Sequence, residues 1–275
     1  MSGKAQSELA MTQLPMVSVV TVNFNMASEI AGTLDSILAQ DYPRLETIVI
    51  DGASTDGSGE IIAGYAGRLS YWVSEPDRNL YDGMNKGVRA ATGDWILFMN
   101  SGDRFADPGV LRSIFSQDSS EADVIYGHHV RHYLEYGIER LVLAETPSVL
   151  PFRMHCSHQS LFMRREILQQ HPFALDLLAA DYEALLAAYL GGKRFKAVDR
   201  VVSIISAGGR SDNNRIAGLF QRMAVLRRHG QMNMALALHY SAQFVRVVLV
   251  VAIMKIMPKP FVAFVRRHRR ITGLG

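Results

Sequence analysis

The stretch Trp95-Ile96-Leu97-Phe98-Met99-Asn100-Ser101-Gly102-Asp103 decides the fold prediction for this chain. Its five apolar residues predict a buried strand, and the small polar residues after them predict a turn that ends in a carboxylate. In an open α/β sheet, ligands bind beyond the carboxyl ends of the strands. The segment alone allows two interpretations. It is either an ordinary turn that closes a strand, or a site at which Asp103 holds a metal ion and a phosphate.

The 275-residue chain has the composition of a globular protein, with 48% hydrophobic and 20% charged residues. Its one cysteine, Cys156, excludes an intrachain disulfide and a cysteine metal cluster. Residues 1–15 are polar and mixed, so we expect a flexible N-terminal tail rather than a signal peptide. We therefore expect a cytoplasmic protein.

Strand and helix patterns alternate along the first half of the chain. Strands are predicted at 17–22, 47–50, 69–73 and 95–99. Helices are predicted from Ser28 as a cap, around Ile61, at 81–91 and at 109–115. Further on, strands are predicted at 123–126, 130–134, 141–144, 160–164 and 201–206, with helices at 181–190 and from 213 onward. This alternation predicts an α/β fold with a mostly parallel sheet covered by helices on both faces.

Carboxylates follow two of the predicted strands and open one predicted helix. Asp51 and Asp56 follow the second strand, Asp103 follows the fourth, and Asp181 and Glu183 open the helix at 181–190. Asp56 is also suited to cap the helix that begins near Gly57, and we favour that interpretation for it. The first strand is not followed by Gly-x-Gly-x-x-Gly, and no Gly-Lys-Ser/Thr loop is present, so both standard nucleotide fingerprints are missing.

Four segments, in order, resemble the family 2 glycosyltransferases of the GT-A fold, over about residues 16–210. They are the first strand with its exit (residues 19–25, VVTVNFN), the turn at 51–58 (DGASTDGS), residues 74–87 (SEPDRNLYDGMNKG), and residues 91–103, which end at Asp103. The third and fourth are similar to the subgroup that builds bacterial exopolysaccharides. The resemblance implies a Rossmann-like GT-A domain at 16–211, followed by a basic helical extension at 212–275.

The same resemblance implies roles for individual residues. It implies a nucleotide-sugar pocket lined by Thr21, Asn23, Asp51, Arg78, Asn85, Lys86 and Ser101. Asp103 matches the family's metal-binding aspartate and would hold Mg²⁺ or Mn²⁺ against the diphosphate. Asp181 matches the general base. His158, in the segment SHQSLFMR at 157–164, would line the acceptor side, and Arg210 would lie in a late loop near the phosphates.

The chain departs from the family pattern at two places. Asn100 and Gly102 stand where the family has further carboxylates, which leaves Asp103 as the acidic residue of that turn. Ala180 stands where the family often has Glu. Because Asp181 and Glu183 are two apart on a helix, they face apart, and we expect Asp181 to be the one that points into the cleft.

The chemistry of sugar transfer agrees with this residue set. A divalent cation spreads the charge of a departing diphosphate, and magnesium often takes only one or two protein carboxylates together with phosphate oxygens and waters. A positioned carboxylate can remove the proton of the attacking hydroxyl. The sequence therefore predicts a metal-dependent, inverting glycosyltransferase. Its donor would be a nucleotide-diphosphate sugar, most simply a UDP-sugar, and its acceptor a saccharide or lipid-linked glycan in surface polysaccharide synthesis.

Two other functions remain open at this point. The thinned acidic motif at 100–103 also suits a non-catalytic module that binds nucleotide-sugars, although such a module would need no base at Asp181. A nucleotidyltransferase would share the strand–helix order but needs a glycine-rich phosphate loop, which is not found after the first strand.

Some of the singled-out residues also have simpler interpretations. Arg78 and Lys86 could be solvated surface charges, and His158 could be a hydrogen-bonded structural histidine. His128, His129 and His132 are better read as a solvated or acceptor-facing cluster than as a metal site, because no other ligand signal accompanies them.

Charge is divided unevenly along the chain. Residues 1–206 carry 17 Lys+Arg and 25 Asp+Glu, whereas residues 207–275 carry 12 Lys+Arg and one acidic residue, Asp212. Apolar residues 244–257 adjoin the cluster at 266–270, which is typical of a helix lying in an anionic membrane surface. The alternative is a helix that packs on the body of the protein or on a second subunit. Binding of nucleic acid is not expected, because the tail lacks interleaved aromatic residues and the body is acidic.

Overall fold

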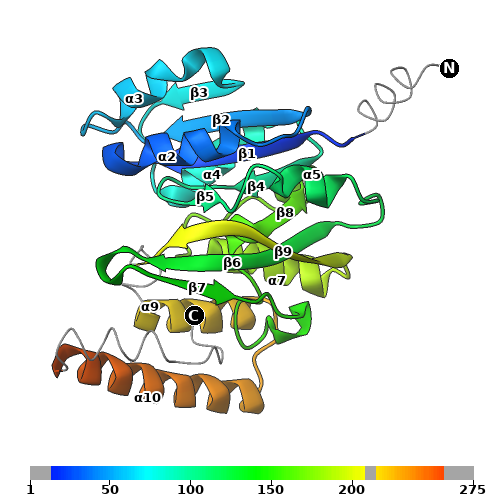
Figure 1. Cartoon of the computed structure of the whole chain (residues 1–275). Helices are drawn as coiled ribbons and strands as arrows, with labels where there is room; N and C mark the ends of the chain where they lie inside the picture. Colours follow the sequence, from blue (N-terminus) through cyan, green and yellow to red (C-terminus); the bar gives the residue numbers. More distant parts are fainter. Residues whose placement is uncertain (1–13, 208–214, 257–275) are drawn as a thin grey trace.

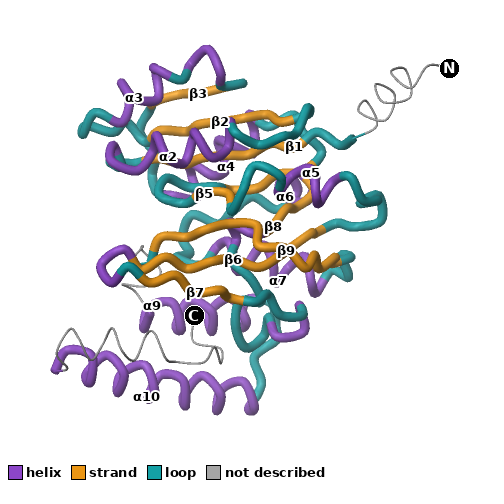
Figure 2. The backbone as a smooth tube through the Cα atoms, viewed as in Figure 1, coloured by secondary structure: helices purple, strands orange, loops and turns teal. Residues whose placement is uncertain are grey.

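The computed structural model describes residues 14–207 and 215–256, and it has a layered α/β architecture (Figures 1 and 2). In this part of the chain, nine strands form one sheet in the order β3-β2-β1-β4-β8-β6-β9-β5, with β7 paired to β6. The strands are β1 (Val17–Asn23), β2 (Leu45–Asp51), β3 (Tyr71–Ser74), β4 (Trp95–Phe98), β5 (Arg104–Phe105), β6 (Val124–Tyr133), β7 (Ile138–Val142), β8 (Leu161–Arg164) and β9 (Phe195–Ser206).

Helices cover both faces of this sheet. They are α2 (Ala27–Leu38), α3 (Ser58–Gly64), α4 (Leu80–Ala90), α5 (Val110–Phe115), α6 (Arg165–Gln170), α7 (Ala180–Leu190), α9 (Arg215–Arg228) and α10 (Met234–Ile256). Short 3₁₀ turns lie at Ala66–Arg68, Leu134–Tyr136, Pro147–Val149 and His158–Ser160. Strands β1 to β4 pair in parallel, whereas β8 pairs antiparallel with both β4 and β6. The predicted α/β class is confirmed.

Alternation along the buried strands explains why two cores form. In β1, Val20 and Val22 face the core shared with α4 and α7, while Val17 and Val19 face the core shared with α5. Two glycines let α4 lie close against β1. A Cβ atom added at Gly87 would come within 2.3 Å of Val20 Cγ1, and one at Gly83 within 2.8 Å of Val22 Cγ1. This close approach holds the start of α4 beside the carboxyl end of β1.

Several predicted boundaries were wrong. Ser28 does not cap α2; the Ala27 N–H instead donates to Asp56 Oδ2 at 2.8 Å. The strands predicted at 123–126 and 130–134 form one strand, β6, with a register shift near His128. Strand β9 begins at Phe195 rather than at residue 201. The two-residue β5 and the six-residue α6 are too short to produce a periodic signal and were missed.

The C-terminal extension packs on the body over part of its length. Val225 and Leu226 of α9, and Leu236 and Tyr240 of α10, are buried in the same core cluster as α7. Figure 1 shows α9 between the strands and α10, at the end of the molecule opposite β3. Packing on the body, one of the two alternatives for this region, therefore describes α9 and the first turns of α10. Most of the predicted N-terminal tail and residues 257–270 lie outside the described residues.

Candidate active site

Aligned strand ends build the predicted nucleotide side of the site. In the parallel register, Asn23 of β1 lies beside Asp51 of β2, which lies beside Ser74 of β3. The buried Asp51 carboxylate accepts hydrogen bonds from Asn23 Nδ2 (2.7 Å), Ser54 Oγ (2.5 Å), Ser74 Oγ (2.6 Å) and Ser54 N (3.0 Å). Burial favours the neutral acid, but these donors outweigh it and hold the pKa of Asp51 below its usual value.

These bonds fill the lone-pair positions of the Asp51 carboxylate. Asp51 therefore fixes the turn that follows β2, and a contact with a nucleobase would have to displace one of its present donors. Ser101 joins the same network, because its Oγ donates to Asn23 Oδ1 at 2.7 Å. Thr21 is fully buried, and its Oγ1 is without a hydrogen-bond partner among the described residues.

The sequence prediction missed an aromatic residue at this end of the sheet. Phe24, directly after β1, is 63% exposed, and its ring borders Gly52. Ala53, which follows Gly52 in the turn, has φ +59°. This left-handed conformation is unfavourable for any residue that has a Cβ atom. An exposed ring beside a strained, hydrogen-bonded turn is suited to stack on a planar ligand. The signal was present in VVTVNFN, where Phe24 follows the buried strand.

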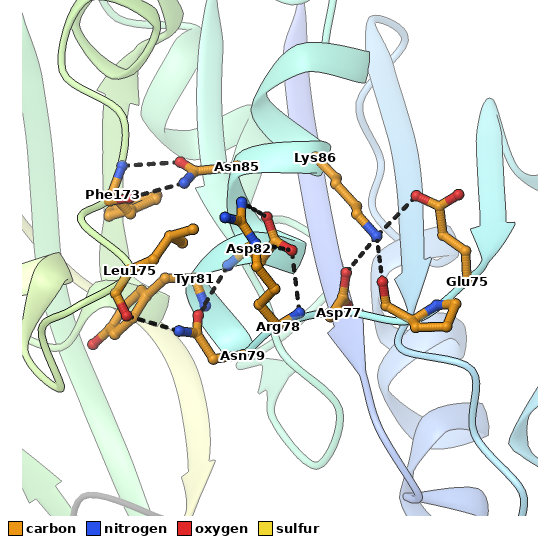
Figure 3. A network of polar contacts seen from close by, with 11 residues as sticks. Glu75, Asp77, Arg78, Asn79, Tyr81, Asp82, Asn85, Lys86, Phe173 and Leu175 are labelled. Atoms are coloured by element: carbon orange, nitrogen blue, oxygen red, sulfur yellow. Dashed lines mark hydrogen bonds and ion pairs between the residues drawn. The ribbon is translucent and has the colours of Figure 1, made fainter.

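Ion pairs engage Arg78 and Lys86, the two cations that were predicted to lie near the nucleotide (Figure 3). Lys86 Nζ lies 2.8 Å from Glu75 Oε1 and 2.7 Å from Asp77 Oδ1, and it donates to Pro76 O at 3.0 Å. Arg78 pairs with Asp82 at 2.9 Å, but its side chain remains 73% exposed. Of the two cations, Arg78 is thus the one that an anionic ligand can reach from solvent, although its partner Asp82 is only 10% exposed.

Asn85 forms a clamp within the protein. Its Nδ2 donates to Phe173 O, and its Oδ1 accepts from Phe173 N, both at 2.9 Å. Asn79, the N-cap of α4, binds Leu175 O at 2.9 Å through its Nδ2 (Figure 3). The two amides attach the segment before α7 to α4, which is the contact that brings Asp181 to this side of the molecule. A contact between Asn85 and the nucleotide stays a prediction.

Asp103, the predicted metal ligand, lies in the turn after β4 and is 7% exposed. Its Oδ2 accepts from Gln159 Nε2 at 2.7 Å, and its Oδ1 accepts from Ser206 N at 3.2 Å. Burial raises the pKa of Asp103 above its usual value, although the hydrogen bond from Gln159 acts in the opposite direction. Each carboxylate oxygen keeps one lone pair for a further partner.

The donor atoms near Asp103 fit a hard cation held by few protein ligands. In the same turn, the buried Asn100 Oδ1 is without a hydrogen-bond partner among the described residues. Across those residues, no group of three or more His, Cys, Asp or Glu side chains is placed to hold a metal. One carboxylate and one amide oxygen suit an Mg²⁺ or Mn²⁺ ion whose remaining ligands are phosphate oxygens and waters.

Asp181, at the start of α7, is held by two side chains. Tyr81 Oη lies 2.9 Å from Asp181 Oδ1, and His158 Nδ1 lies 3.3 Å from Asp181 Oδ2. Burial would favour the protonated acid, but the contacts with His158 and Tyr81 outweigh it and hold the pKa of Asp181 below its usual value. A cavity of about 20 Å³ borders Asp181 and His158, and its other lining residues are apolar. Asp181 is thus an ionised carboxylate in an apolar wall.

The dipeptide His158–Gln159 links the two carboxylates. His158 contacts Asp181, while the neighbouring Gln159 donates to Asp103. His158 Nε2 also lies 3.3 Å from Asn100 Nδ2, so one 3₁₀ turn contacts the candidate base Asp181, the candidate metal ligand Asp103, and Asn100 from the same turn as Asp103. The prediction placed His158 near the acceptor but missed Gln159 and Tyr81. Gln159 is adjacent to it in the quoted motif, whereas Tyr81 could be found only from the fold.

Glu183, the other candidate base, is engaged elsewhere. Its Oε1 lies 3.1 Å from Arg228 Nη1 and 3.5 Å from His229 Nε2, so it attaches α7 to α9.

Of the histidine cluster, His128 pairs with Asp199 at 3.1 Å, and burial lowers the pKa of His129 to about 4. Arg210 and the loop at 208–211 lie outside the described residues.

The family to which the chain belongs follows from comparison with known proteins. The family described as "Glycosyl transferase family 2" matches residues 18–171, which contain Asp51, Asp103 and the His158–Gln159 dipeptide. The chain belongs to glycosyltransferase family 2. An uncharacterized glycosyltransferase of Mycobacterium tuberculosis strain H37Rv is 34% identical over 194 residues, or 66% of this chain and 71% of that protein. A PGL/p-HBAD biosynthesis glycosyltransferase of Mycobacterium bovis BCG is 30% identical over 156 residues, or 55% of this chain and 60% of that protein.

Solved structures confirm the GT-A fold of this family 2 member. Mannosyltransferase PcManGT from Pyrobaculum calidifontis, solved with GDP-Man and Mn²⁺, superposes with a TM-score of 0.63 at 18% identity, covering 94% of this chain and 85% of that one. S. aureus TarS 1–349, solved with UDP-GlcNAc, superposes with a TM-score of 0.62 at 18% identity, covering 84% and 71%. At 18% identity, the similarity to these two structures shows the fold alone.

Proposed function

We propose that this family 2 glycosyltransferase moves a sugar from a nucleoside-diphosphate donor to a hydroxyl of a saccharide or lipid-linked acceptor, with inversion at the anomeric carbon. One observation carries the proposal. The ionised Asp181 is held by Tyr81 and His158 in an apolar wall, and the His158–Gln159 dipeptide ties it to Asp103 on the donor side. A base on one side and a phosphate-binding turn on the other are what in-line displacement requires.

On the donor side, the hydrogen-bonded turn and the exposed ring of Phe24 would hold the base and ribose. Asn23, Asp51 and Ser101 fix the strand ends on which the base would rest. Arg78, in the segment between β3 and α4, is 73% exposed and would pair with a phosphate in exchange for its contact with Asp82. UDP-GlcNAc is bound by one fold relative and GDP-Man by another, and a UDP-sugar is our first choice for this chain.

We also propose that the enzyme uses a divalent metal ion. Asp103, with Asn100 Oδ1 beside it in the turn, would hold Mg²⁺ or Mn²⁺. Such an ion, when bound, neutralises charge that develops on the leaving diphosphate. Mn²⁺ was present when PcManGT was solved. Because the protein supplies few ligands, metal and nucleotide should bind together, and each should bind weakly alone.

The acceptor step is assigned to this chain's own residues. Asp181 accepts the proton of the attacking hydroxyl as that oxygen bonds to the anomeric carbon and the sugar–diphosphate bond breaks. Tyr81 and His158 orient the carboxylate, and the apolar lining keeps bulk water away from it. A single displacement by a hydroxyl on the face opposite the leaving group inverts the anomeric centre and needs no covalent enzyme intermediate.

Relatives point to the class of product. One is named for PGL/p-HBAD biosynthesis. Another, TuaG of Bacillus subtilis, is named a putative teichuronic acid biosynthesis glycosyltransferase and is 32% identical over 94 residues, 33% of this chain and 37% of that protein. We therefore propose a role in making a surface glycan.

A non-catalytic nucleotide-sugar binding module is the second candidate, favoured by the ion pairs that already neutralise Lys86. One experiment separates the two functions. UDP-sugars and GDP-sugars are titrated calorimetrically with and without Mn²⁺, and each sugar that binds is incubated with soluble saccharide acceptors. The anomeric configuration of any product is read by proton NMR. A product with inverted configuration supports transfer, tight binding with neither transfer nor donor hydrolysis supports the module, and a product of retained configuration contradicts the mechanism.

A further inference from the structure

The outward face of α10 is apolar although no described part of the protein covers it. Met234, Leu238, Val245 and Leu249 are separated by four, seven and four residues, so they share one face of the helix. Leu238 is 65% exposed and Leu249 is 57% exposed. A surface helix normally turns polar side chains to water on the side away from the core. Here that side carries four large apolar side chains, with the exposed Ser241 among them.

The opposite face of α10 fixes the helix to the body. Leu236 and Tyr240 are buried, and Tyr240 Oη donates to Pro151 O at 3.1 Å. Phe244 contacts Phe220 of α9, with ring centroids 5.7 Å apart. The helix is therefore seated on the molecule by its inward face, and its outward face is presented to a partner in a defined direction. Figure 1 shows α10 running along one end of the molecule.

The charge of the C-terminal region selects the kind of partner. Arg246 lies at the edge of the apolar face, and the sequence from 213 to 275 contains cationic residues but no Asp or Glu. A second copy of the chain would bring the same positive charges together without acidic partners. An anionic lipid surface supplies both an apolar layer for the leucines and valines and negative headgroups for the arginines.

We propose that the outward face of α10 docks onto an anionic lipid bilayer, lying in the interface rather than crossing it. None of the described helices is both long and apolar enough to span a membrane. Membrane contact was predicted for residues 244–270, whereas in the structure the apolar outward face of α10 begins at Met234.

Docking in this direction has a consequence for the acceptor, which rests on the proposed function. Phe220 adjoins Gln221, whose Oε1 accepts from Leu178 N at 3.4 Å. The half-exposed Leu178 is in turn bonded through its carbonyl to Tyr81, the residue that holds Asp181. Helix α9, against which α10 packs, is therefore connected to Asp181 through a short chain of contacts. Docking of α10 on a bilayer would bring this side of the molecule toward the lipid surface that carries a lipid-linked acceptor.

The test uses the full chain and sucrose-loaded vesicles of phosphatidylcholine, with or without about one third phosphatidylglycerol. The double variant Leu238→Ser/Leu249→Ser removes apolar surface from the outward face without touching the packed side. Tyr71→Ser removes a half-exposed ring from β3, at the opposite end of the molecule, and is the matched control. Thermal melting of each variant confirms folding, and light scattering reports the oligomeric state.

The wild type and Tyr71→Ser should sediment with the anionic vesicles and remain in solution with the neutral ones. The double variant should lose about tenfold or more of this binding. Equal sedimentation of the double variant would overturn the assignment of the face. A wild-type dimer that the leucine substitutions convert to a monomer, without vesicle binding, would assign the face to a second copy instead. Donor titration of the same samples is a separate readout, so a failure of the proposed reaction is distinguishable from a failure of docking.

Discussion

Replacement of Gln159 by Leu tests the link between the two carboxylates. The substitution keeps the size of the side chain and removes the 2.7 Å hydrogen bond from Gln159 Nε2 to the buried Asp103 Oδ2. Hydrogen bonds to charged groups contribute about 1.5–3 kcal/mol, because an unpaired buried charge also loses its hydration. Asp103 would retain only the 3.2 Å bond from Ser206 N on its side chain. We therefore expect the free energy of unfolding to fall by about 1.5–3 kcal/mol.

Urea denaturation at neutral pH, followed by circular dichroism, measures this loss. Gln117→Leu is the matched control, because Gln117 is exposed and makes only a 3.5 Å contact with Ser113 O; its stability should change by less than about 0.5 kcal/mol. Since the same turn carries His158 to Asp181, kcat for transfer should fall about tenfold or more, with a smaller change in donor affinity. If the free energy of unfolding and kcat of Gln159→Leu both equal those of the wild type, the His158–Gln159 dipeptide does not position the two carboxylates.

Three further predictions concern the strained turn and the two acidic residues of α7. Ala53→Gly should stabilise the protein by about 0.5–1 kcal/mol in thermal or urea unfolding, because glycine adopts φ +59° without strain; a less stable variant would show that the turn is unstrained. Glu183→Gln should leave kcat within about twofold, because Glu183 pairs with Arg228 and His229 of the α9 region and not with Asp181 or its partners; loss of transfer would make Glu183 the base. The pKa of Asp181 is lowered, so its ionised form persists down through the usual Asp range and is lost only below it. The rate of transfer measured against pH should therefore show no loss caused by protonation of Asp181 above about pH 4. A loss of rate above this pH that shifts or disappears in Asp181→Glu would contradict the prediction.

Local patterns sufficed to predict the first half of the fold. The β-branched run at 17–22 and the apolar run at 95–99 appear as neighbouring parallel strands, and Asp51 and Asp103 follow their strands as expected. Strand β9 was shortened in the prediction, because its first residues alternate between half-buried and exposed positions and lack a continuous apolar run. Pairing with β6 determines where that strand begins, and sequence patterns do not report such pairing.

The site shows the same division between local and long-range information. Family motifs located Asp51, Asp103, His158 and Asp181, all of which lie at strand ends or helix starts. Several groups that hold these residues are far from them in sequence. Tyr81 binds Asp181 across 100 residues, and Ser206 binds Asp103 across 103. No local pattern could reveal that Lys86 is neutralised by Glu75 and Asp77, or that both ends of the Asn85 amide are taken by Phe173.

The Asp181→Asn variant is the sharpest test of Asp181 as the general base, because it keeps the shape of the side chain and removes the proton acceptor. A donor that binds the wild type in the calorimetric screen is titrated into both proteins, and transfer to the same acceptor is measured in parallel. We expect Asp181→Asn to bind the donor within about threefold of the wild type and to transfer the sugar about a hundred- to ten-thousand-fold more slowly. Transfer at the wild-type rate by a folded Asp181→Asn protein would contradict the assignment of Asp181 as the base.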